Sequence, residues 1–283
     1  MNLKTKIDNY LAAALDGDAV MTDEVIETFG ERCKDALRKQ FSGEKHEFAI
    51  RMSGIGKPLC QQQLAKEGAE REKPEPSLKM KLAYGDMVEA LVMAVLDSAE
   101  DIDVQSFQEP VEYQLGETKI KGTLDVVVDN KVYDIKSASK YAFDMKFSRP
   151  DGFQKVVKDD PFGYVSQGYL YAAAKDTKFG GWIAFNKETG GIAVTEAPDT
   201  DGSYKQTAIS NARSNADALN LDLPFKRKFG PVPELVRKKP TGNKTLDVTC
   251  RYCSYKHTCW GDEIVWRKNP RGSTYRYYFG EPK

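Results

Sequence analysis

The sequence predicts a mixed α/β fold in which helices flank a sheet. Three observations predict this class: the order of apolar patterns along the chain, a two-residue turn signal between two strand-like runs, and an ordinary globular composition. The chain has 283 residues, of which 40% are hydrophobic and 30% charged. This length allows one large domain or two small ones around a substantial core.

The first 48 residues are expected to be helical. Apolar residues recur there at steps of three and four, at Ile26, Phe29, Cys33, Leu37 and Phe41. Such spacing places them on one helix face, which we expect to be buried. Thr22 and Asp23 are candidate N-cap residues. Cys33 is accordingly expected to be a small buried residue of this face rather than a metal ligand.

A second helix is expected over residues 78–99, which carry apolar residues on most sides. This pattern predicts a buried helix. Glu89 lies in its middle, where a carboxylate needs a charged partner, a hydrogen bond or a metal ion. Glu89 is therefore a candidate functional residue, and a position at the edge of the helix is the alternative.

Three strands follow, over residues 111–115, 119–128 and 131–137. Asp129 and Asn130 fit a two-residue hairpin turn between the last two strands. With this turn, Asp125 lies directly opposite Asp134, and strand alternation places Lys136 on the same face as Asp134. Opposed like charges destabilise a sheet, so the two carboxylates need a compensating partner.

The second half of the chain continues the alternation of helices and strands. A helix over residues 164–174 carries Gln167 and Tyr171 one turn apart on one face. The remaining expected elements are a hairpin over 182–186 and 192–195 and a helix over 206–219. This order of elements is typical of a mixed sheet flanked by helices.

Asp125, Asp134 and Lys136 form the strongest chemical signal in the chain. Paired carboxylates suit Mg²⁺ or Mn²⁺, and such a cation removes their repulsion. A neighbouring lysine orients or deprotonates a water while the metal polarises a phosphoryl oxygen, which is the chemistry of phosphodiester hydrolysis. The alternative is a hairpin with a solvated polar face.

The hairpin resembles a known nuclease motif. The runs Gly122–Asp125 and Tyr133–Lys136 together are similar to the core motif of the PD-(D/E)XK nucleases. Leu124 stands where the proline that names the family occurs, and the second acid is Asp134 rather than the commoner Glu. The resemblance covers residues 49–262 and implies a restriction-endonuclease-like mixed sheet flanked by helices, with a C-terminal iron–sulphur lobe.

Two further motifs resemble the RecB-like branch of that family. Gln167 and Tyr171 match its Q-x-x-x-Y motif, and Gly85 with Glu89 fits its upstream helix. The resemblance implies that one or two Mg²⁺ or Mn²⁺ ions are held by Glu89, Asp125, Asp134 and the Ile135 carbonyl. It implies that Lys136 positions the attacking water, and that Gln167 and Tyr171 brace the site or the DNA backbone.

Four of the five cysteines form a second candidate site. Cys250, Cys253 and Cys259 lie in a C-x2-C-x5-C cluster, and Cys60 lies far upstream. Clustered thiols indicate a metal site. The set is similar to that of AddB-type and CRISPR-associated exonucleases, which implies a structural [4Fe-4S] cluster. Thiolates suit zinc equally well, so zinc is the alternative.

The C-terminal residues form a basic lobe within a chain of zero net charge. Residues 225–283 contain 14 Lys and Arg against 5 Asp and Glu, whereas residues 1–224 contain 28 against 37. Aromatic residues are interleaved with the basic ones, a pattern that suits single-stranded nucleic acid. Lys155 and Lys158, expected in a loop over 154–160, either contact DNA as well or are simply solvated.

The sequence thus predicts three parts: an N-terminal helical segment (1–48), a RecB-like nuclease core (49–224) and a basic lobe with three cluster cysteines (225–283). The expected function is a metal-dependent DNA nuclease, an exonuclease in preference to an endonuclease, for recombination, repair or phage DNA processing. The rival is a non-catalytic DNA-binding or recombination-accessory module.

The expected partners are DNA that is single-stranded or has free ends, together with a second copy of the chain or a recombination protein. No run of eighteen apolar residues occurs, and the N-terminus lacks the apolar stretch of a signal peptide. Membrane and secretory classes are therefore excluded. The expected location is cytoplasmic, in a bacterial or phage-infected cell.

Overall fold

The computed structural model describes residues 1–44, 47–198, 202–268 and 275–282. The helices are α1 (Leu3–Asp16), α2 (Asp23–Phe41), α3 (Met52–Ile55), α4 (Leu59–Lys66), α5 (Ser77–Ser98), α6 (Lys140–Ala142), the π-helix η1 (Phe143–Phe147), α7 (Gly152–Lys158), α8 (Tyr164–Ala174), α9 (Ser203–Asn220), α10 (Val248–Tyr252), α11 (Lys256–Trp260) and the 3-10 helix η2 (Gly261–Glu263). The strands are β1 (Val104–Leu115), β2 (Thr118–Val128), β3 (Lys131–Ala138), β4 (Lys178–Asn186), β5 (Ile192–Glu196), β6 (Val232–Val236), β7 (Lys239–Thr245), β8 (Ile264–Lys268) and β9 (Tyr275–Phe279).

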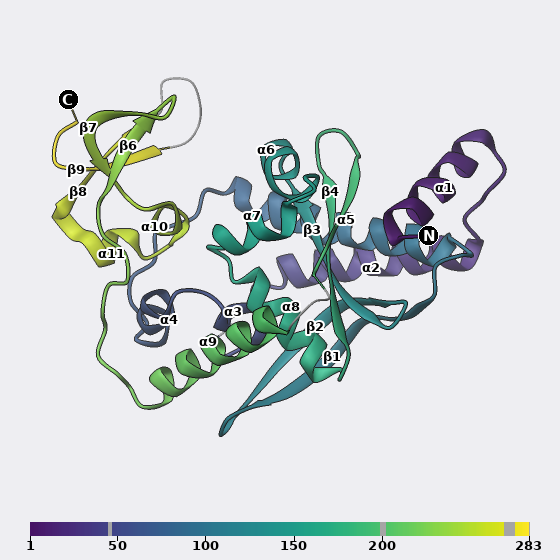
Figure 1. Cartoon of the computed structure of the whole chain (residues 1–283), viewed down its shortest axis with the longest axis horizontal. Coiled ribbons are helices and arrows are strands. Elements are labelled where there is room, and N and C mark those ends of the chain that lie inside the picture. Colours follow the sequence, from purple (N-terminus) through teal and green to yellow (C-terminus); the bar gives the residue numbers. More distant parts are fainter. Residues whose placement is uncertain (45–46, 199–201, 269–274, 283) are drawn as a thin grey trace.

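The main sheet has five strands in the order β1-β2-β3-β4-β5. β3 and β4 are parallel and the other neighbours are antiparallel. The chain crosses from β3 to β4 through α6, η1, α7 and α8, as a parallel connection requires. This arrangement confirms the predicted mixed α/β sheet with helices on both sides (Figure 1).

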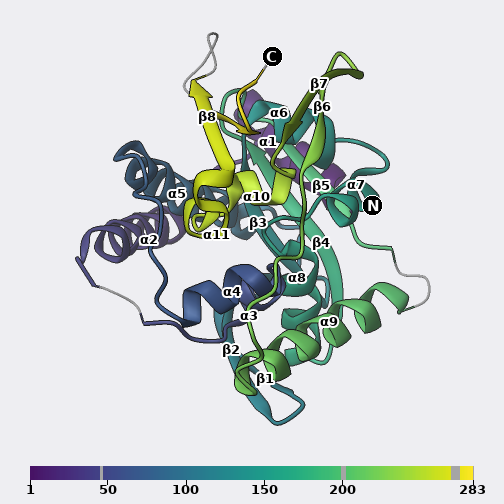
Figure 2. The ribbon, with the colours of Figure 1, turned by 90° about the vertical axis from the view of Figure 1, so that its left-hand side faces the viewer.

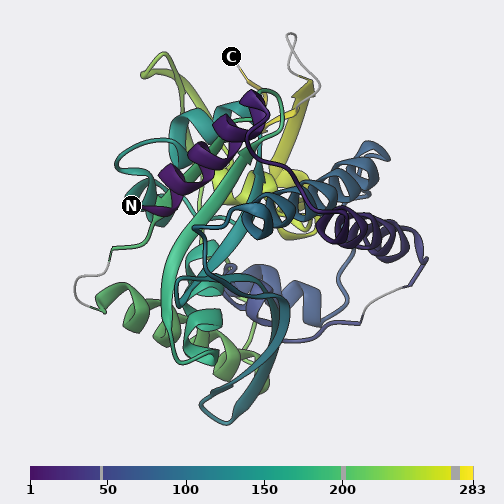
Figure 3. The ribbon, with the colours of Figure 1, turned by 90° about the vertical axis from the view of Figure 1, so that its right-hand side faces the viewer.

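Apolar clusters fill both faces of the sheet. On one face, residues of α3, α7, α8 and α9 pack on Leu124, Val132 and Trp182. On the other face, residues of α1 and α5 pack on Val126 and Ile135. Helix α2 lies outside α5, as Figure 3 shows. No helix within the described ranges combines the length and apolarity needed to cross a membrane.

The β2–β3 hairpin has the predicted register. Val128 pairs with Lys131, and pairing continues to Val126 with Tyr133. The turn residues Asp129 and Asn130 have φ of 47° and 57°. Both angles are left-handed, as a type I′ hairpin turn requires, and Asp and Asn tolerate this conformation better than most residues.

The predicted helices are present, but the burial expected of two of them is wrong. Thr22 caps α2 as expected, accepting a hydrogen bond from the Val25 amide. Of the predicted apolar face, however, Ile26, Leu37 and Phe41 are exposed. The buried residues of α2 are Val25 and Ala36, because α2 packs mainly on α5 and its other side faces solvent.

Helix α5 is buried only over its second half. Val92, Met93 and Leu96 lie in the core, whereas Met80 and Leu82 are exposed. Residues 152–158 form α7, so the expectation of a loop over 154–160 is wrong for most of that segment. Strand β1 also begins seven residues earlier than predicted, at Val104.

The C-terminal residues form a separate small unit. Its sheet has the strand order β6-β7-β9-β8, with α10 and α11 between β7 and β8. Figure 1 shows this lobe at the opposite end of the molecule from α1, and Figure 2 looks onto it. A small apolar cluster that includes Leu246, Trp260 and Ile264 forms its core.

The segment before α5 attaches to this lobe. The Glu72 amide donates to the Ser254 carbonyl at 2.7 Å, and the Glu72 carboxylate pairs with the buried Lys256. The Thr258 hydroxyl donates to the Glu70 carbonyl at 2.6 Å. We call these contacts of residues 70–72 with residues 254–258 the Glu72 clasp.

Candidate functional site

The predicted carboxylates lie where β2 and β3 stop pairing. The last backbone pair joins Val126 and Tyr133. One residue further, Asp125 Oδ2 accepts a hydrogen bond of 2.7 Å from the Ile135 amide. The Asp125 side chain therefore takes the place of a backbone hydrogen bond between β2 and β3. The polar residues lie at this end of the hairpin, where the two strands separate. Ile135, whose carbonyl is the predicted ligand, stands between Asp134 and Lys136 on β3.

Asp134 and Lys136 form a buried ion pair. Lys136 Nζ lies 2.5 Å from Asp134 Oδ2, and the side-chain exposures are 17% for Lys136 and 0% for Asp134. Among the described residues, Asp134 Oδ1 has no hydrogen-bond partner. Burial raises the pKa of the Asp134 carboxyl, and the Lys136 ammonium opposes that rise. A buried acceptor without a partner is unfavourable by about 1–3 kcal/mol, so this oxygen needs a cation or a donor.

Two further carboxylates belong to the same electrostatic cluster. Burial, followed by repulsion from Glu89 and Asp134, raises the pKa of Asp125 well above its ordinary value. Burial also raises the pKa of Glu89 to about 7, against the attraction of Lys136 and Lys39. The predicted acids Glu89, Asp125 and Asp134 therefore influence one another across α5, β2 and β3.

Gly85 sets the position of Glu89. A Cβ atom at Gly85 would lie 3.3 Å from Ser137 Oγ, so glycine lets α5 approach β3 closely. Glu89 follows one turn later on the same helix face. Its carboxylate accepts a short hydrogen bond from Gln108, whose φ is 48°.

Lys136 remains charged in this environment. Burial alone would lower the pKa of its ammonium group, but the attraction of Asp134 and Asp125 outweighs burial and raises the pKa. Its Nζ also lies 4.7 Å from the centre of the Tyr164 ring, on α8. A charged lysine donates hydrogen bonds and attracts anions, and it does not accept a proton.

Helix α8 brings the predicted Gln167 and Tyr171 to this side of the sheet. Gln167 Nε2 donates to the Tyr171 hydroxyl at 3.2 Å. A Cβ atom at Gly122 would lie 2.5 Å from the Tyr171 ring, so a glycine at this position lets the ring lie against β2. Burial raises the pKa of Tyr171 to about 12, and Asp125 adds to the shift. The structure thus brings Gln167 and Tyr171 close to the carboxylates.

Sequence analysis missed Tyr164 and Gln108. Tyr164 precedes Gln167 by three residues and Tyr171 by seven, so helical periodicity places it on the same face of α8. That periodicity is the signal that could have found it. Gln108 carries no such signal, because its contact with Glu89 joins β1 to α5.

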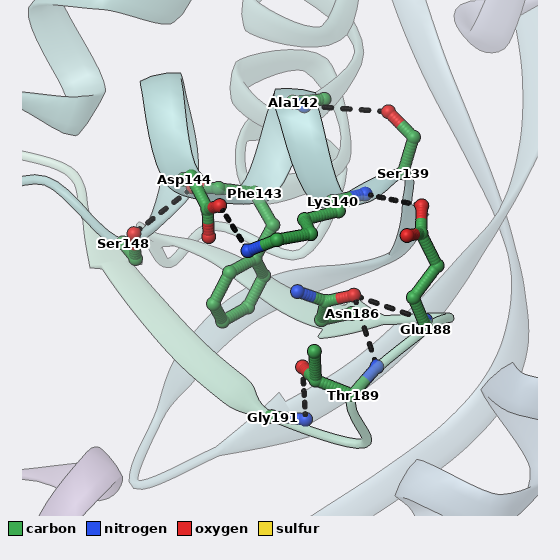
Figure 4. Close-up of polar contacts among 10 residues, drawn as sticks. All are labelled: Ser139, Lys140, Ala142, Phe143, Asp144, Ser148, Asn186, Glu188, Thr189 and Gly191. Carbon is green, nitrogen blue, oxygen red and sulfur yellow. Dashed lines mark hydrogen bonds and ion pairs between the residues drawn. The ribbon is translucent and has the colours of Figure 1, made fainter.

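A second Lys–Asp pair follows β3 and provides a contrast. Lys140 Nζ lies 2.6 Å from Asp144 Oδ2, and both side chains are about half exposed. Figure 4 shows this pair beside the β4–β5 turn, where the Lys140 amide donates to Glu188 at 3.2 Å. The Asn186 side chain accepts from two amides of that turn. These contacts fasten α6 to the turn.

The chemistry of the carboxylate cluster fits a hard divalent cation. Carboxylate oxygens are the ligands that Mg²⁺ and Mn²⁺ prefer, and Asp134 Oδ1 is a buried oxygen without a partner. As placed, no three His, Cys, Asp or Glu side chains of the described ranges converge on one metal position.

The four predicted cluster cysteines line one cavity. Cys60 comes from α4, Cys250 from α10, Cys253 from the turn after it and Cys259 from α11. Burial raises the pKa of the Cys250 thiol to about 12 and raises those of Cys253 and Cys259. Leu64, Phe229 and Trp260 complete an apolar lining. The fifth cysteine, Cys33, lies apart on α2 and is half-buried.

No protein-family model matches the chain, and no curated protein matches its sequence. Among solved structures, the crystal structure of SSO0001 is 14% identical, with a TM-score of 0.42 over 81% of this chain and 95% of that chain. A Eubacterium rectale protein described as a "Putative exonuclease" is 15% identical, with a TM-score of 0.36 over 68% of this chain and 76% of that chain. Similarity at this level establishes neither the fold nor the activity of this chain. The function is therefore inferred from the residues of the site.

Proposed function

We propose that the chain is a metal-dependent DNA nuclease that hydrolyses phosphodiester bonds. The observation that carries the proposal is the buried Asp134, whose Oδ1 lacks a partner while its other oxygen contacts Lys136. Two more acids with raised pKa values, Glu89 and Asp125, belong to the same cluster. The buried Asp134 and the partly buried Asp125 and Glu89 repel each other, and a divalent cation relieves that repulsion.

In this proposal, Glu89, Asp125, Asp134 and the Ile135 carbonyl hold Mg²⁺ or Mn²⁺. The bound ion supplies Lewis-acid polarisation of the phosphoryl oxygen and stabilises charge on the leaving oxygen. Lys136, which lies beside Asp134, orients the attacking water and attracts the scissile phosphate. Gln167 and Tyr171 brace the cluster from α8.

Linear and covalently closed circular DNA, each with Mg²⁺ and with EDTA, test the proposal. The wild type should degrade linear DNA only with the metal, and Asp134→Asn should abolish this degradation. Asp144→Asn is the matched control, because Asp144 forms a similar ion pair in solvent. Failure of the wild type to cleave any DNA with either Mg²⁺ or Mn²⁺ would refute the nuclease and favour the accessory DNA-binding module.

We propose further that the enzyme works from DNA ends or on single strands. The basic residues of 225–283 support this substrate, because positive charge attracts phosphates and exposed rings stack on unpaired bases. Trp266 and Tyr275 of the lobe are exposed. Closed circles should survive conditions that destroy linear DNA, whereas rapid nicking of circles would identify an endonuclease.

We propose that the four-cysteine cavity holds a [4Fe-4S] cluster with a structural role. Four thiols in an apolar pocket fit an iron–sulphur cluster or zinc. Anaerobically purified protein should contain iron and acid-labile sulphide, and Cys60→Ser should lose both together with solubility. Cys33→Ser is the control and should keep them. Stoichiometric zinc without sulphide would contradict the iron–sulphur cluster and identify the site as a zinc site.

A further inference from the structure

A row of aromatic rings leads away from Lys136. The Lys136 ammonium faces the Tyr164 ring at 4.7 Å. Phe162 stacks on Tyr164 with ring centres 5.3 Å apart and planes inclined by 28°. Tyr252 of α10 meets Phe162 with centres 5.4 Å apart. We call Tyr164, Phe162 and Tyr252 the aromatic row, and it connects the carboxylate cluster to the C-terminal lobe.

The outer rings of this row are open to solvent. Phe162 is 38% exposed and Tyr252 is 62% exposed, whereas Tyr164 is half-buried beside Lys136. Rings that serve only to pack two parts of a protein together are normally buried between them. These exposed rings continue a spatial row that starts at Lys136. Their faces are open, so the bases of a nucleic acid can stack on them.

A polar cavity of about 450 Å³ lies against the same elements. It reaches Asp160 beside Phe162 and Val248–Thr249 on the helix that carries Tyr252. Three lysines line it, namely Lys57, Lys158 and Lys228. None of the three forms an ion pair within the described part of the chain.

The acids of this cavity are already engaged. Asp159 pairs with Lys146 at 2.8 Å. Asp160 accepts from the Tyr164 and Val165 amides, each at 2.9 Å. Asp247 accepts from the Thr249 amide at 2.8 Å. None of these acids is paired with Lys57, Lys158 or Lys228 in the described residues, and lysines without an acidic partner attract anions such as backbone phosphates.

We propose that Phe162 and Tyr252 stack the bases of an unpaired DNA strand that runs between the carboxylate cluster and the C-terminal lobe. This inference rests on the proposed nuclease function and specifies its substrate as a strand whose bases are unpaired at the row. The lysine cavity holds backbone phosphates of the same strand. Bases paired in a duplex stack on each other and cannot present their faces to these rings.

A binding experiment with and without bases tests the row. The ligands are a fluorescent oligothymidylate and an oligonucleotide of equal length whose central positions are abasic, and binding is measured in EDTA so that cleavage does not interfere. The wild type should bind oligothymidylate more tightly. Phe162→Ala and Tyr252→Ala should each reduce this preference by roughly tenfold, the effect of losing one stacked base.

Matched variants separate stacking from structure. Phe48 is also 38% exposed and has no ring contact within the described residues, so Phe48→Ala should keep the full preference. Phe162→Trp should keep it too, because the indole offers a stacking face. If Phe162→Ala and Tyr252→Ala keep the wild-type fold by circular dichroism and weaken binding to both ligands equally, the stacking role is overturned.

The two proposals fail in different ways. Metal-dependent degradation by the wild type, with an unchanged base preference in both alanine variants, would overturn the aromatic row and leave the nuclease intact. A reduced preference in the variants, with no cleavage by the wild type in any metal, would support the row and overturn the nuclease. A wild type that binds both oligonucleotides equally would overturn the row outright.

Discussion

Two Lys–Asp pairs, whose lysines are four residues apart along the chain, have nearly the same N–O distance but very different surroundings. Lys136 and Asp134 approach to 2.5 Å, and Lys140 and Asp144 to 2.6 Å. The first pair is 17% and 0% exposed, whereas the second is 55% and 45% exposed. An ion pair in water contributes about 0–1 kcal/mol, whereas a buried charge without its partner is strongly destabilising.

The difference shows that burial, rather than the ion pair alone, gives these residues unusual electrostatics. Water surrounds Lys140 and Asp144, hydrates both charges and screens their attraction. Asp134 shares a desolvated space with Glu89 and Asp125, and burial raises the pKa values of all three. Of the two pairs, only the buried one lies among excess carboxylates that an additional positive charge would stabilise.

The largest expected difference between the pairs is in activity. Lys136→Ala should lower the rate of metal-dependent DNA degradation by roughly 100- to 10,000-fold, the range for losing a positioned group that acts on the attacking water. Lys140→Ala should leave the rate within about twofold, because surface ion pairs contribute little. Initial rates on end-labelled linear DNA measure both. Equal losses of activity in the two variants would contradict the claim that burial distinguishes Lys136 from Lys140.

The second expected effect is on stability against pH in metal-free protein. Because burial raises the pKa of Glu89 from its ordinary 4.5 to about 7, the folded chain keeps this proton after the unfolded chain has lost it. The free energy of unfolding therefore falls as pH rises from about 4.5 to about 7. Glu89→Gln should reduce this fall, to which Asp125 and Asp134 also contribute, and be more stable than the wild type above pH 7, by on the order of 1–3 kcal/mol.

Urea unfolding in EDTA across that pH range measures this effect. Added Mg²⁺ should stabilise the wild type above pH 7 and leave Glu89→Gln less affected, because the cation then relieves the repulsion that the variant already lacks. Parallel stability curves for the two proteins would show that Glu89 lies outside the strained cluster.

The smallest expected effect is the coupling within the exposed pair. A double-mutant cycle on Lys140 and Asp144 should give about 0.3–0.5 kcal/mol or less, as for other helical pairs four residues apart. The order of charges weakens it further, because the lysine precedes the aspartate and opposes the helix dipole. A coupling above about 1 kcal/mol at moderate salt would mean that exposure does not distinguish the two pairs.

The hairpin could be predicted from the sequence because its signals are local. Asp129 and Asn130 tolerate left-handed angles, and the turn alone sets which residues of β2 and β3 face each other. Counting residues from this turn along both strands then predicts that Asp125 and Asp134 lie close together. Periodicity likewise placed Gln167 and Tyr171 on one face of α8.

Burial and distant pairing could not be predicted in this way. The spacing of Ile26, Leu37 and Phe41 defines a helix face, but only tertiary packing decides what covers it, and α5 covers Val25 and Ala36 instead. The small C-terminal sheet was also missed. Strand β7 contains Pro240, Gly242 and Asn243, which are poor strand formers, and its partner β9 lies beyond two helices.

The Glu72 clasp has a consequence for the order in which the protein is made. Lys256 is 184 residues downstream of Glu72, so the two meet only after nearly the whole chain has left the ribosome. Domains generally fold as they are synthesised, from the N-terminus onward. The five-stranded sheet can therefore form first, while Cys60 and residues 70–72 wait in solvent. The C-terminal lobe docks last, and a chain that ends before residue 254 has its carboxylates but lacks Cys259, strands β8 and β9 and the lobe's part of the Glu72 clasp.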